Sequence, residues 1–223
     1  MILCCGEALI DMLPRKTGAG ESAFAPYAGG AVFNTAIALG RLGAPAEFFS
    51  GLSTDLFGQQ LTRVLAESKA GTRYAHFSPR PTTMAFVELK NGHASYLFYD
   101  EGTAGRMLAP QDLPILADDV EALLFGAISL IPEPCGSTYE ALMAREHGRR
   151  VTMLDPNIRP SFIPDRARHT ERIRRMVGMA DIVKLSDEDL DWFEEEGSRE
   201  EIVSRWLARG PKLIVVTCGG DGA

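Results

Sequence analysis

Hydrogen-bonding side chains and glycines follow the first apolar run of the sequence at positions that suit a ligand rich in hydroxyl groups. Asp11 stands at the edge of that run, and its carboxylate could accept hydrogen bonds from two neighbouring hydroxyls; a surface turn explains the position equally well. Gly29 and Gly30 precede a helical stretch and would let the backbone approach a ligand closely. Asn34, in the first turn of that helix, can both donate and accept, although an ordinary glycine-rich helix start is the alternative.

Two later loops carry charge that could serve a phosphoryl group. Residues 155–160 contain two prolines, and such a stiff loop could hold Arg159 over a pocket, where its guanidinium would neutralise a phosphoryl group in transfer. Ser186 and the acids after it have the composition of a helix start, and capping alone accounts for them. The functional alternative is that Asp189 orders water around a magnesium ion.

The last apolar run, 213–217, leads into a glycine-rich turn. Thr217, Gly219 and Gly222 could form a phosphate or nucleotide edge there, although any tight turn after a strand also uses glycine. No G-x-G-x-x-G follows the first strand, which counts against a dinucleotide-binding oxidoreductase.

The elements that must position these residues alternate between short apolar runs and helical periodicity. Strands are expected at 2–5, 46–52, 83–89, 94–99, within 122–131, and at 151–154, 181–185 and 213–217. Helices are expected at 32–42, 56–69, 137–147, 187–196 and 199–209. From about residue 120 the order reads β-α-β-α-β-α-α-β with continuously apolar strands, which indicates a parallel sheet covered on both faces.

Two stretches differ from this pattern. The runs 83–89 and 94–99 alternate more, and Asn91-Gly92 between them is a hairpin signal. Residues 14–27 are rich in Gly, Ala and Pro and are expected to form a flexible break in the first βα unit. We therefore expect one α/β domain over residues 1–223, with a doubly wound, mostly parallel sheet. A small β-sheet lid from about 9–28 and 80–104 is expected to be inserted in it, and ligands of such sheets bind beyond the carboxyl ends of the strands.

The composition disfavours several classes of protein. The 223 residues carry 23 basic and 30 acidic side chains, a net charge of −7, which argues against a nucleic-acid partner. No uncharged run approaches the roughly 20 residues of a membrane span, and no signal peptide is visible before the first strand. The four cysteines form no C-x-x-C pair, which favours reduced thiols in a cytoplasmic protein over a metal site.

Seven short motifs, in this order along the chain, resemble those of the ribokinase-like (PfkB) sugar kinase family and, within it, the fructokinases. The matching segments are GEALID (6–11), GGAVFNTA with LGRLG (29–36 and 39–43), GLSTDLFG (51–58), FYD (98–100), DPNIRP (155–160), VKLSDEDL (183–190) and VVTCGGDGA (215–223). Each motif alone is weak, but the ordered set spans the chain and is specific. The resemblance implies transfer of the γ-phosphoryl group of ATP to a sugar hydroxyl, with Mg²⁺ and a monovalent cation such as K⁺ as cofactors.

On the sugar side, the resemblance implies that Asp11, Asn34 and the backbone at Gly29 and Gly30 bind hydroxyl groups. It also implies that Phe98 packs against the sugar from the lid. Arg159 is then the cation near the substrate and the transferred phosphate, and it is the one catalytic residue that we assign in this chain.

On the nucleotide side, the resemblance assigns Thr217, Gly219 and Gly222 to a loop that borders ATP. Ser186 and Asp189 stand where many relatives have an N-x-x-E motif linked to magnesium and phosphate. The motif is altered here, so the metal ligands are left unassigned.

One departure from the family concerns catalysis. The family's catalytic aspartate lies in a G-A-G-D loop that also supplies N–H donors to the developing anion, and the sequence contains no G-A-G-D. Loss of such donors alone costs on the order of 10²- to 10³-fold in rate. We therefore expect the 223 residues by themselves to be inactive.

The preferred sugar is predicted from one position. Members that act on 2-keto-3-deoxygluconate carry Arg where this chain has Asp100, and a carboxylate there would repel an acidic sugar, which favours a neutral ketohexose such as fructose. The alternatives are a 2-keto-3-deoxygluconate or nucleoside kinase of the same family and a sugar-binding module without catalysis. Relatives pair such flaps, so a homodimer through the β lid is expected, with sugar and ATP as the small-molecule partners.

Overall fold

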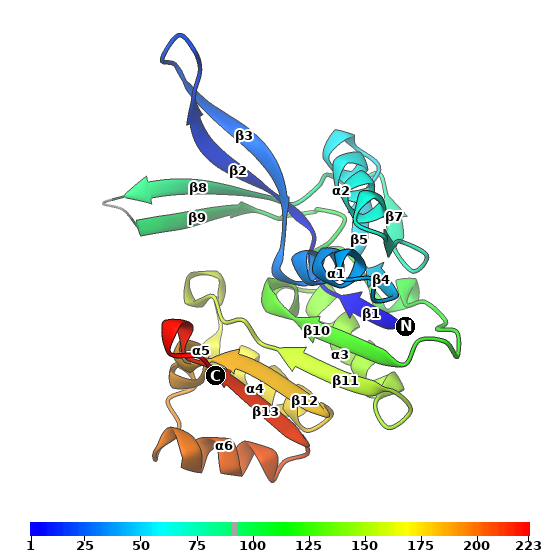
Figure 1. Cartoon of the computed structure of the whole chain (residues 1–223), viewed down its shortest axis with the longest axis vertical. Coiled ribbons are helices and arrows are strands. Elements are labelled where there is room, and N and C mark those ends of the chain that lie inside the picture. Colours follow the sequence, from blue (N-terminus) through cyan, green and yellow to red (C-terminus); the bar gives the residue numbers. More distant parts are fainter. Residues whose placement is uncertain (91–92) are drawn as a thin grey trace.

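The computed structural model describes residues 1–90 and 93–223, which form an α/β body and a smaller β-sheet that projects from it (Figure 1). The body is built on a seven-stranded sheet in the order β13-β12-β11-β10-β1-β4-β6, with every neighbouring pair parallel. Its strands are β1 (Ile2–Cys5), β4 (Ala46–Phe49), β6 (Ala70–Gly71), β10 (Ala122–Gly126), β11 (Val151–Asp155), β12 (Ile182–Ser186) and β13 (Leu213–Thr217).

Helices cover both faces of this sheet. They are α1 (Ala31–Arg41), α2 (Leu56–Glu67), α3 (Cys135–Glu146), α4 (Arg166–Val177), α5 (Asp187–Trp192) and α6 (Arg199–Leu207). On β1, Leu3 and Cys5 belong to a core shared with α3, α4 and α6, whereas Cys4 between them packs in a second core with α1 and α2. Successive residues of one strand are therefore buried on opposite faces, which confirms the predicted doubly wound fold.

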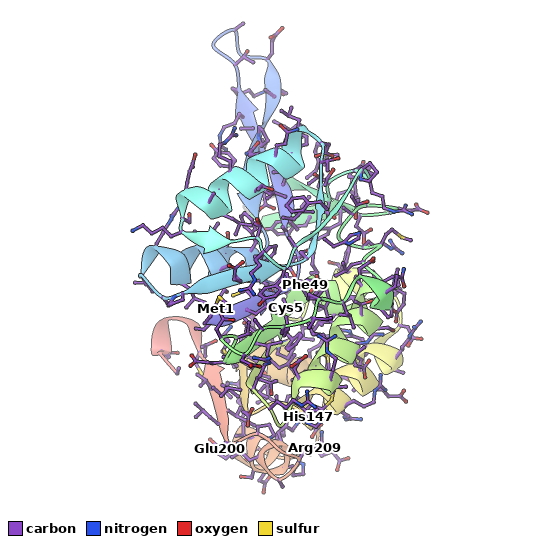
Figure 2. The ribbon with its side chains drawn as sticks, turned by 90° about the vertical axis from the view of Figure 1, so that its right-hand side faces the viewer. Met1, Cys5, Phe49, His147, Glu200 and Arg209 are labelled. Carbon is purple, nitrogen blue, oxygen red and sulfur yellow. The ribbon has the colours of Figure 1, made fainter. Side chains whose placement is uncertain are left out.

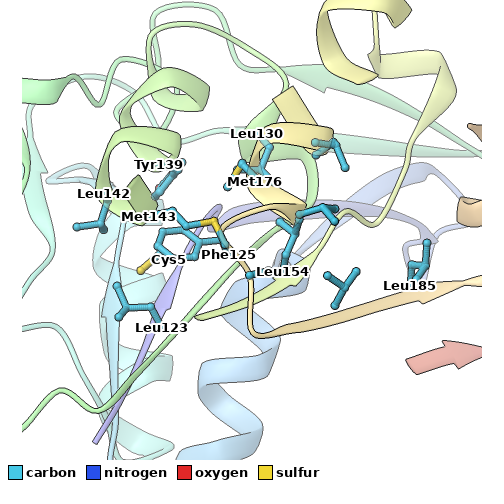
Figure 3. Close-up of a cluster of buried hydrophobic side chains, with 14 of the residues drawn as sticks. Cys5, Leu123, Phe125, Leu130, Tyr139, Leu142, Met143, Leu154, Met176 and Leu185 are labelled. Carbon is cyan, nitrogen blue, oxygen red and sulfur yellow. The ribbon is translucent and has the colours of Figure 1, made fainter. Parts of the chain in front are cut away.

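The larger core fixes the carboxyl ends of the strands, where the predicted site lies. Three side chains of α3, those of Tyr139, Leu142 and Met143, belong to the same core as Cys5 and Phe125 of the sheet (Figure 3). Cys5 and its partner on β4, Phe49, lie near the middle of the molecule, far from Glu200 and Arg209 at its lower end (Figure 2).

The smaller sheet, called the small sheet below, has the strand order β3-β2-β8-β9. Its strands are β2 (Leu9–Lys16), β3 (Ser22–Gly29), β8 (Met84–Lys90) and β9 (His93–Tyr99). Two antiparallel pairs, β2 with β3 and β8 with β9, are joined where β2 runs parallel to β8 at Ile10–Met12. The predicted strand pair on either side of Asn91-Gly92 is thus present, while that turn itself lies outside the described residues. A separate short ladder joins β5 (Gly51–Ser53) to β7 (His76–Ser78).

Residues 14–27 do interrupt the first βα unit, as predicted, but the prediction that they are flexible is wrong. These residues belong to the regular hairpin β2–β3 and to its turn. Proline is tolerated because Pro26 lies on β3, at the edge of the small sheet, and Pro14 lies beyond the part of β2 that pairs with β8.

Other element boundaries differ from the predictions for local reasons. The run 46–52 divides into β4 and β5 because the chain leaves the main sheet at Ser50 to pair with β7. The run 122–131 is a strand only to Gly126 and continues as the 3₁₀ helix Ala127–Leu130. Helix α5 ends at Trp192 rather than at residue 196, since Glu194 has a φ of 51°, which no helix continues.

Helix α4 was expected from the element order but not located in the sequence. Its twelve residues include five arginines, which obscure the apolar stripe formed by Ile173, Met176 and Val177. Arg172 is itself buried on that stripe, because Glu133 and Glu140 neutralise it. Within the described part of the chain, no helix has the length and apolar character needed to cross a membrane.

Candidate functional site

A chamber of about 560 Å³ lies at the carboxyl ends of β1, β10, β11 and β12, under the small sheet. Five of the predicted sugar-side residues line it together: Asp11, Gly30, Asn34, Phe98 and Arg159. They come from β2, the turn before α1, α1 itself, β9 and the loop after β11. Residues as far apart in the sequence as Asp11 and Arg159 therefore share one cavity. This is where parallel sheets place ligands, because the loops after the strands meet at that edge.

Asp11 and Gly29 lie against each other on the hairpin β2–β3. A Cβ atom at Gly29 would stand 2.1 Å from Oδ2 of Asp11, so glycine is needed for the carboxylate to keep its place. Partial burial raises the pKa of Asp11. Gly29 is therefore adjacent to the chamber through Asp11 rather than as part of its wall.

Glu7 contacts the turn before α1 and the first residues of that helix. No role was predicted for this residue from the sequence. Gly30 has a φ of 112°, and a Cβ there would lie 2.8 Å from the carbonyl oxygen of Glu7. The Glu7 carboxylate accepts hydrogen bonds from the N–H groups of Ala31, at 2.7 Å, and Val32, at 3.3 Å. An acidic residue placed directly after a buried strand was the available signal.

Phe98 connects the small sheet to the loop that carries Arg159. Its ring lies 4.6 Å from that of Phe162, centroid to centroid, and stacks at 6.1 Å on Tyr96, which also lines the chamber. Arg159 is exposed, and its Nη1 donates to the carbonyl of Ile158 at 2.8 Å. Arg159 lines both the chamber and a second cavity of about 320 Å³.

Ser186 and Asp189 line that second cavity, not the chamber. They form a reciprocal cap at the start of α5, in which the Ser186 hydroxyl accepts from the Asp189 N–H and Asp189 Oδ2 accepts from the Ser186 N–H. Oδ1 of Asp189 accepts from the N–H of Ile158 at 2.8 Å, 31 residues away. Asp189 thus ties the Arg159 loop to β12.

This geometry bears on the magnesium assignment. Both oxygens of the buried Asp189 are engaged by main-chain donors, so a direct metal-ligand role does not fit that carboxylate. Glu188, its exposed neighbour, lines both cavities. The described residues contain no group of three or more His, Cys, Asp or Glu side chains arranged to hold a metal ion.

The remaining predicted residues lie apart from both cavities. Thr217 pairs with Ser186 across β12 and β13, but neither cavity is lined by Thr217, Gly219 or Gly222. The two glycines are exposed, with φ values of 56° and 96°, and the turn is closed by a hydrogen bond from the Cys218 N–H to the Gly222 carbonyl at 2.7 Å.

The argument from Asp100 does not hold as the sequence suggested it. Its carboxylate forms an ion pair with Arg106 at 3.0 Å and does not line the chamber. The charge at this position is therefore largely neutralised, since an arginine six residues along the chain folds back onto it. The charged side chains that line the chamber, apart from the buried Glu7 in its wall, are two carboxylates, those of Asp11 and Glu188, and one guanidinium, that of Arg159.

Comparison with known proteins gives a consistent result. The chain matches the family described as "pfkB family carbohydrate kinase" over residues 1–223. It is 60% identical over its whole length to a fructokinase from Rhizobium leguminosarum bv. trifolii and covers 68% of that protein.

Two solved structures have the same fold. A fructokinase with bound ATP from Xylella fastidiosa aligns with a TM-score of 0.89 at 29% identity, over 98% of this chain and 72% of that one. A Vibrio cholerae fructokinase, solved in a form with bound fructose, ADP and calcium ion, aligns with a TM-score of 0.85 at 27% identity, over 99% and 71% of the two chains. The fold, the motif order and the match along all 223 residues agree, and the chain belongs to the PfkB family of carbohydrate kinases.

Proposed function

We propose that this protein phosphorylates a neutral ketohexose, fructose, with ATP as the phosphoryl donor. The observation that carries the proposal is the convergence of Asp11, Gly30, Asn34, Phe98 and Arg159 on one chamber. Carboxylate and amide groups match the hydroxyls of a sugar, and an aromatic ring matches its apolar face. Fructokinases with the same fold bind fructose and ATP or ADP according to their descriptions, which supports the same ligands here.

The charge around the chamber supports a neutral sugar, for a different reason than the one expected from Asp100. Because Asp11, Glu188 and the buried Glu7 outnumber the single guanidinium of Arg159, a sugar acid would meet net repulsion, to which Asp11 and Glu188 contribute most. A ketohexose brings no charge and can use Asp11 as an acceptor for its hydroxyls.

In the proposed reaction, this chain's residues bind, orient and shield the sugar. Arg159, which lines both cavities, would place its positive charge beside the phosphoryl group as that group passes to the sugar hydroxyl. The segments 9–28 and 80–104, proposed as a lid, would exclude water through Phe98 and Tyr96 and so limit hydrolysis of ATP.

For the nucleotide side, we propose that Ser186 and Asp189 act by shaping the loop around the second cavity, and that Thr217, Gly219 and Gly222 border ATP. The chemistry that Mg²⁺ supplies when bound with ATP is neutralisation of phosphate charge. Glu188 is the carboxylate of this chain placed to help hold it, while Mg²⁺ usually keeps several waters and is bound largely through phosphates. We also propose that the activity requires K⁺. A comparison of the activity in potassium and sodium buffers tests this requirement.

We also propose a cytoplasmic homodimer that associates through the small sheet. Phe24, Tyr27, Leu97 and Tyr99 of this sheet are between 47% and 60% exposed, an apolar area that a second copy could cover. Sedimentation of the purified protein tests the dimer, and a Leu97→Glu variant should then sediment as a monomer.

A substrate panel on the protein expressed from its complete gene tests the function. Phosphorylation by MgATP is measured with fructose, 2-keto-3-deoxygluconate and a nucleoside, and fructose is expected to give the highest kcat/KM. A higher kcat/KM with the sugar acid would overturn the substrate assignment. Calorimetry of the 223-residue chain with fructose is the companion measurement, and sugar binding without product would favour a sugar-binding module for these residues.

A further inference from the structure

Glu7 is a buried acid in the wall of the chamber for which the proposed reaction has no direct use. It follows β1 and is 8% exposed. Its Oε1 accepts two main-chain hydrogen bonds at the start of α1, and its Oε2 is buried without a hydrogen-bond partner among the described residues. A buried carboxylate oxygen without a partner costs stability, so packing alone does not explain the choice of this residue.

Glu7 contacts the turn before α1 at three points. Its carboxylate holds the N–H groups of Ala31 and Val32, and its carbonyl oxygen lies so close to Gly30 that no side chain fits there. The Asn34 N–H donates to the Gly30 carbonyl at 2.9 Å, which fixes the first turn of the helix on the same support. A shift of Glu7 would therefore move Gly30 and Asn34 together, relative to Asp11 on β2.

We propose that Glu7 is a positioning residue for sugar binding, whose carboxylate holds the Gly30–Asn34 turn against Asp11 so that the chamber keeps a shape complementary to the sugar. This inference rests on the proposed function. Glu7 acts through the turn, because its unpaired oxygen is buried and presents no surface to a ligand. An ionised carboxylate holds the two N–H groups more strongly than a neutral group, since charge-assisted hydrogen bonds are stronger and anions are favoured at a helix start.

Other charged and titratable groups surround Glu7 and must be separated from it in any experiment. Asp11, Arg159 and Glu188 share the chamber with it. On its other side, Glu7 also lines a small cavity together with Asp100, Arg106, Cys135 and Tyr139. A comparison of wild type with Glu7→Gln isolates Glu7, because the amide keeps an oxygen acceptor for Ala31 and Val32 and removes only the titration and the charge.

The test is steady-state kinetics of the protein expressed from its complete gene, with fructose and MgATP varied in turn. Glu7→Ala is expected to raise the KM for fructose by about 10- to 100-fold, because a displaced turn misplaces the sugar. The KM for MgATP should remain as in wild type. The control is Leu142→Ala, a fully buried change in α3 on the opposite face of the sheet, which lowers stability without touching the chamber.

Glu7→Gln gives the second readout. Its KM for fructose should match that of wild type at about pH 6 and exceed it by about threefold or more at about pH 8, where wild type gains the ionised carboxylate. A Glu7→Ala variant whose KM for fructose equals that of Leu142→Ala would overturn the inference, as would a fructose KM and MgATP KM that rise equally. Wild type without activity on fructose would instead overturn the proposed function and this inference with it, so the two failures are distinguishable.

Discussion

The chamber and the exposed turn after β13 were both predicted from glycine-rich motifs, yet they differ in how the fold holds them. At the chamber, two glycines are required by close contacts, Gly29 with the Asp11 carboxylate and Gly30 with the Glu7 carbonyl. At the turn after β13, a Cβ atom on Gly219 or Gly222 would meet nothing within 4 Å, and these glycines are needed only for their positive φ.

The difference shows what each region can recognise. Side chains and backbone from six segments of the chain line the chamber, which suits a small ligand recognised through its individual hydroxyl groups. The turn after β13 offers main-chain groups on an exposed edge, which suits a phosphate or nucleotide that is read by charge. Arg159 lines the chamber and the second cavity, whereas the turn after β13 lines neither.

Loss of Arg159 should have the largest effect, because this residue lines both the chamber and the second cavity. Arg159→Ala is expected to lower kcat on the order of 10²- to 10³-fold, because the transferred charge loses its fixed partner. Initial rates of ADP formation with fructose measure this. Arg149→Ala, an exposed arginine in the turn before β11, is the matched control and should keep the wild-type rate.

Titration of Glu7 should make the stability of the chamber depend on pH. Burial raises the pKa of Glu7 from 4.5 to about 7, although main-chain N–H groups of Glu7, Val32 and Ala31 oppose the rise. The unfolded chain then releases this proton at lower pH than the folded chain, so Glu7 destabilises the fold increasingly as pH rises from 4.5 to about 7. Urea unfolding at about pH 8 should find Glu7→Gln more stable than wild type by up to about 3 kcal/mol, with no difference at about pH 4. An equal difference at both values would contradict the assignment.

A change confined to the chamber should spare the nucleotide. Asp11→Asn is expected to raise the KM for fructose by about 10- to 100-fold, since a hydrogen bond to a charged acceptor contributes about 1.5–3 kcal/mol. The KM for MgATP should not change. Glu21→Gln, at the exposed end of the same hairpin, is the control, and a similar rise in that variant would place the effect in the hairpin rather than in the carboxylate.

Substitutions of Glu188 and Asp189 should have different effects, because we expect Glu188 to act in MgATP binding and Asp189 to act in stability. Asp189→Ala should lower the free energy of unfolding by about 2 kcal/mol, because the buried N–H of Ile158 and the partly buried N–H of Ser186 lose their acceptor. Glu188→Gln should leave the free energy of unfolding unchanged and weaken the binding of MgATP, which calorimetry measures. If Asp189→Ala weakened MgATP binding and Glu188→Gln did not, the metal-linked role would belong to Asp189.

Much of this fold could be predicted from the sequence because its strands are continuous apolar runs. The strand limits of β1 and β13 were predicted without error, and the alternation at 83–99 indicated the hairpin of the small sheet. Helix α4 was expected from the element order but was not located, because its buried Arg172 looks like a surface residue until Glu133 and Glu140 are placed beside it.

The chamber could be predicted where residues of recognisable motifs line it, and not where contacts between residues distant in the sequence decide what a side chain does. Asp11 and Asn34 stand in recognisable motifs, and the structure brings them to one chamber. The saturation of Asp189 depends on an N–H group 31 residues away, and the neutralisation of Asp100 depends on how the chain turns back to Arg106. Such pairings follow from the tertiary fold, which local spacing does not encode.

The most direct test is a crystal structure of the protein with bound fructose. The sugar is predicted to occupy the chamber, with its hydroxyls in hydrogen-bond distance of the Asp11 carboxylate and the Asn34 amide and its carbon face against Phe98. Fructose bound elsewhere, or in the chamber without contact to Asp11 and Asn34, would contradict the central claim that these residues form one sugar site.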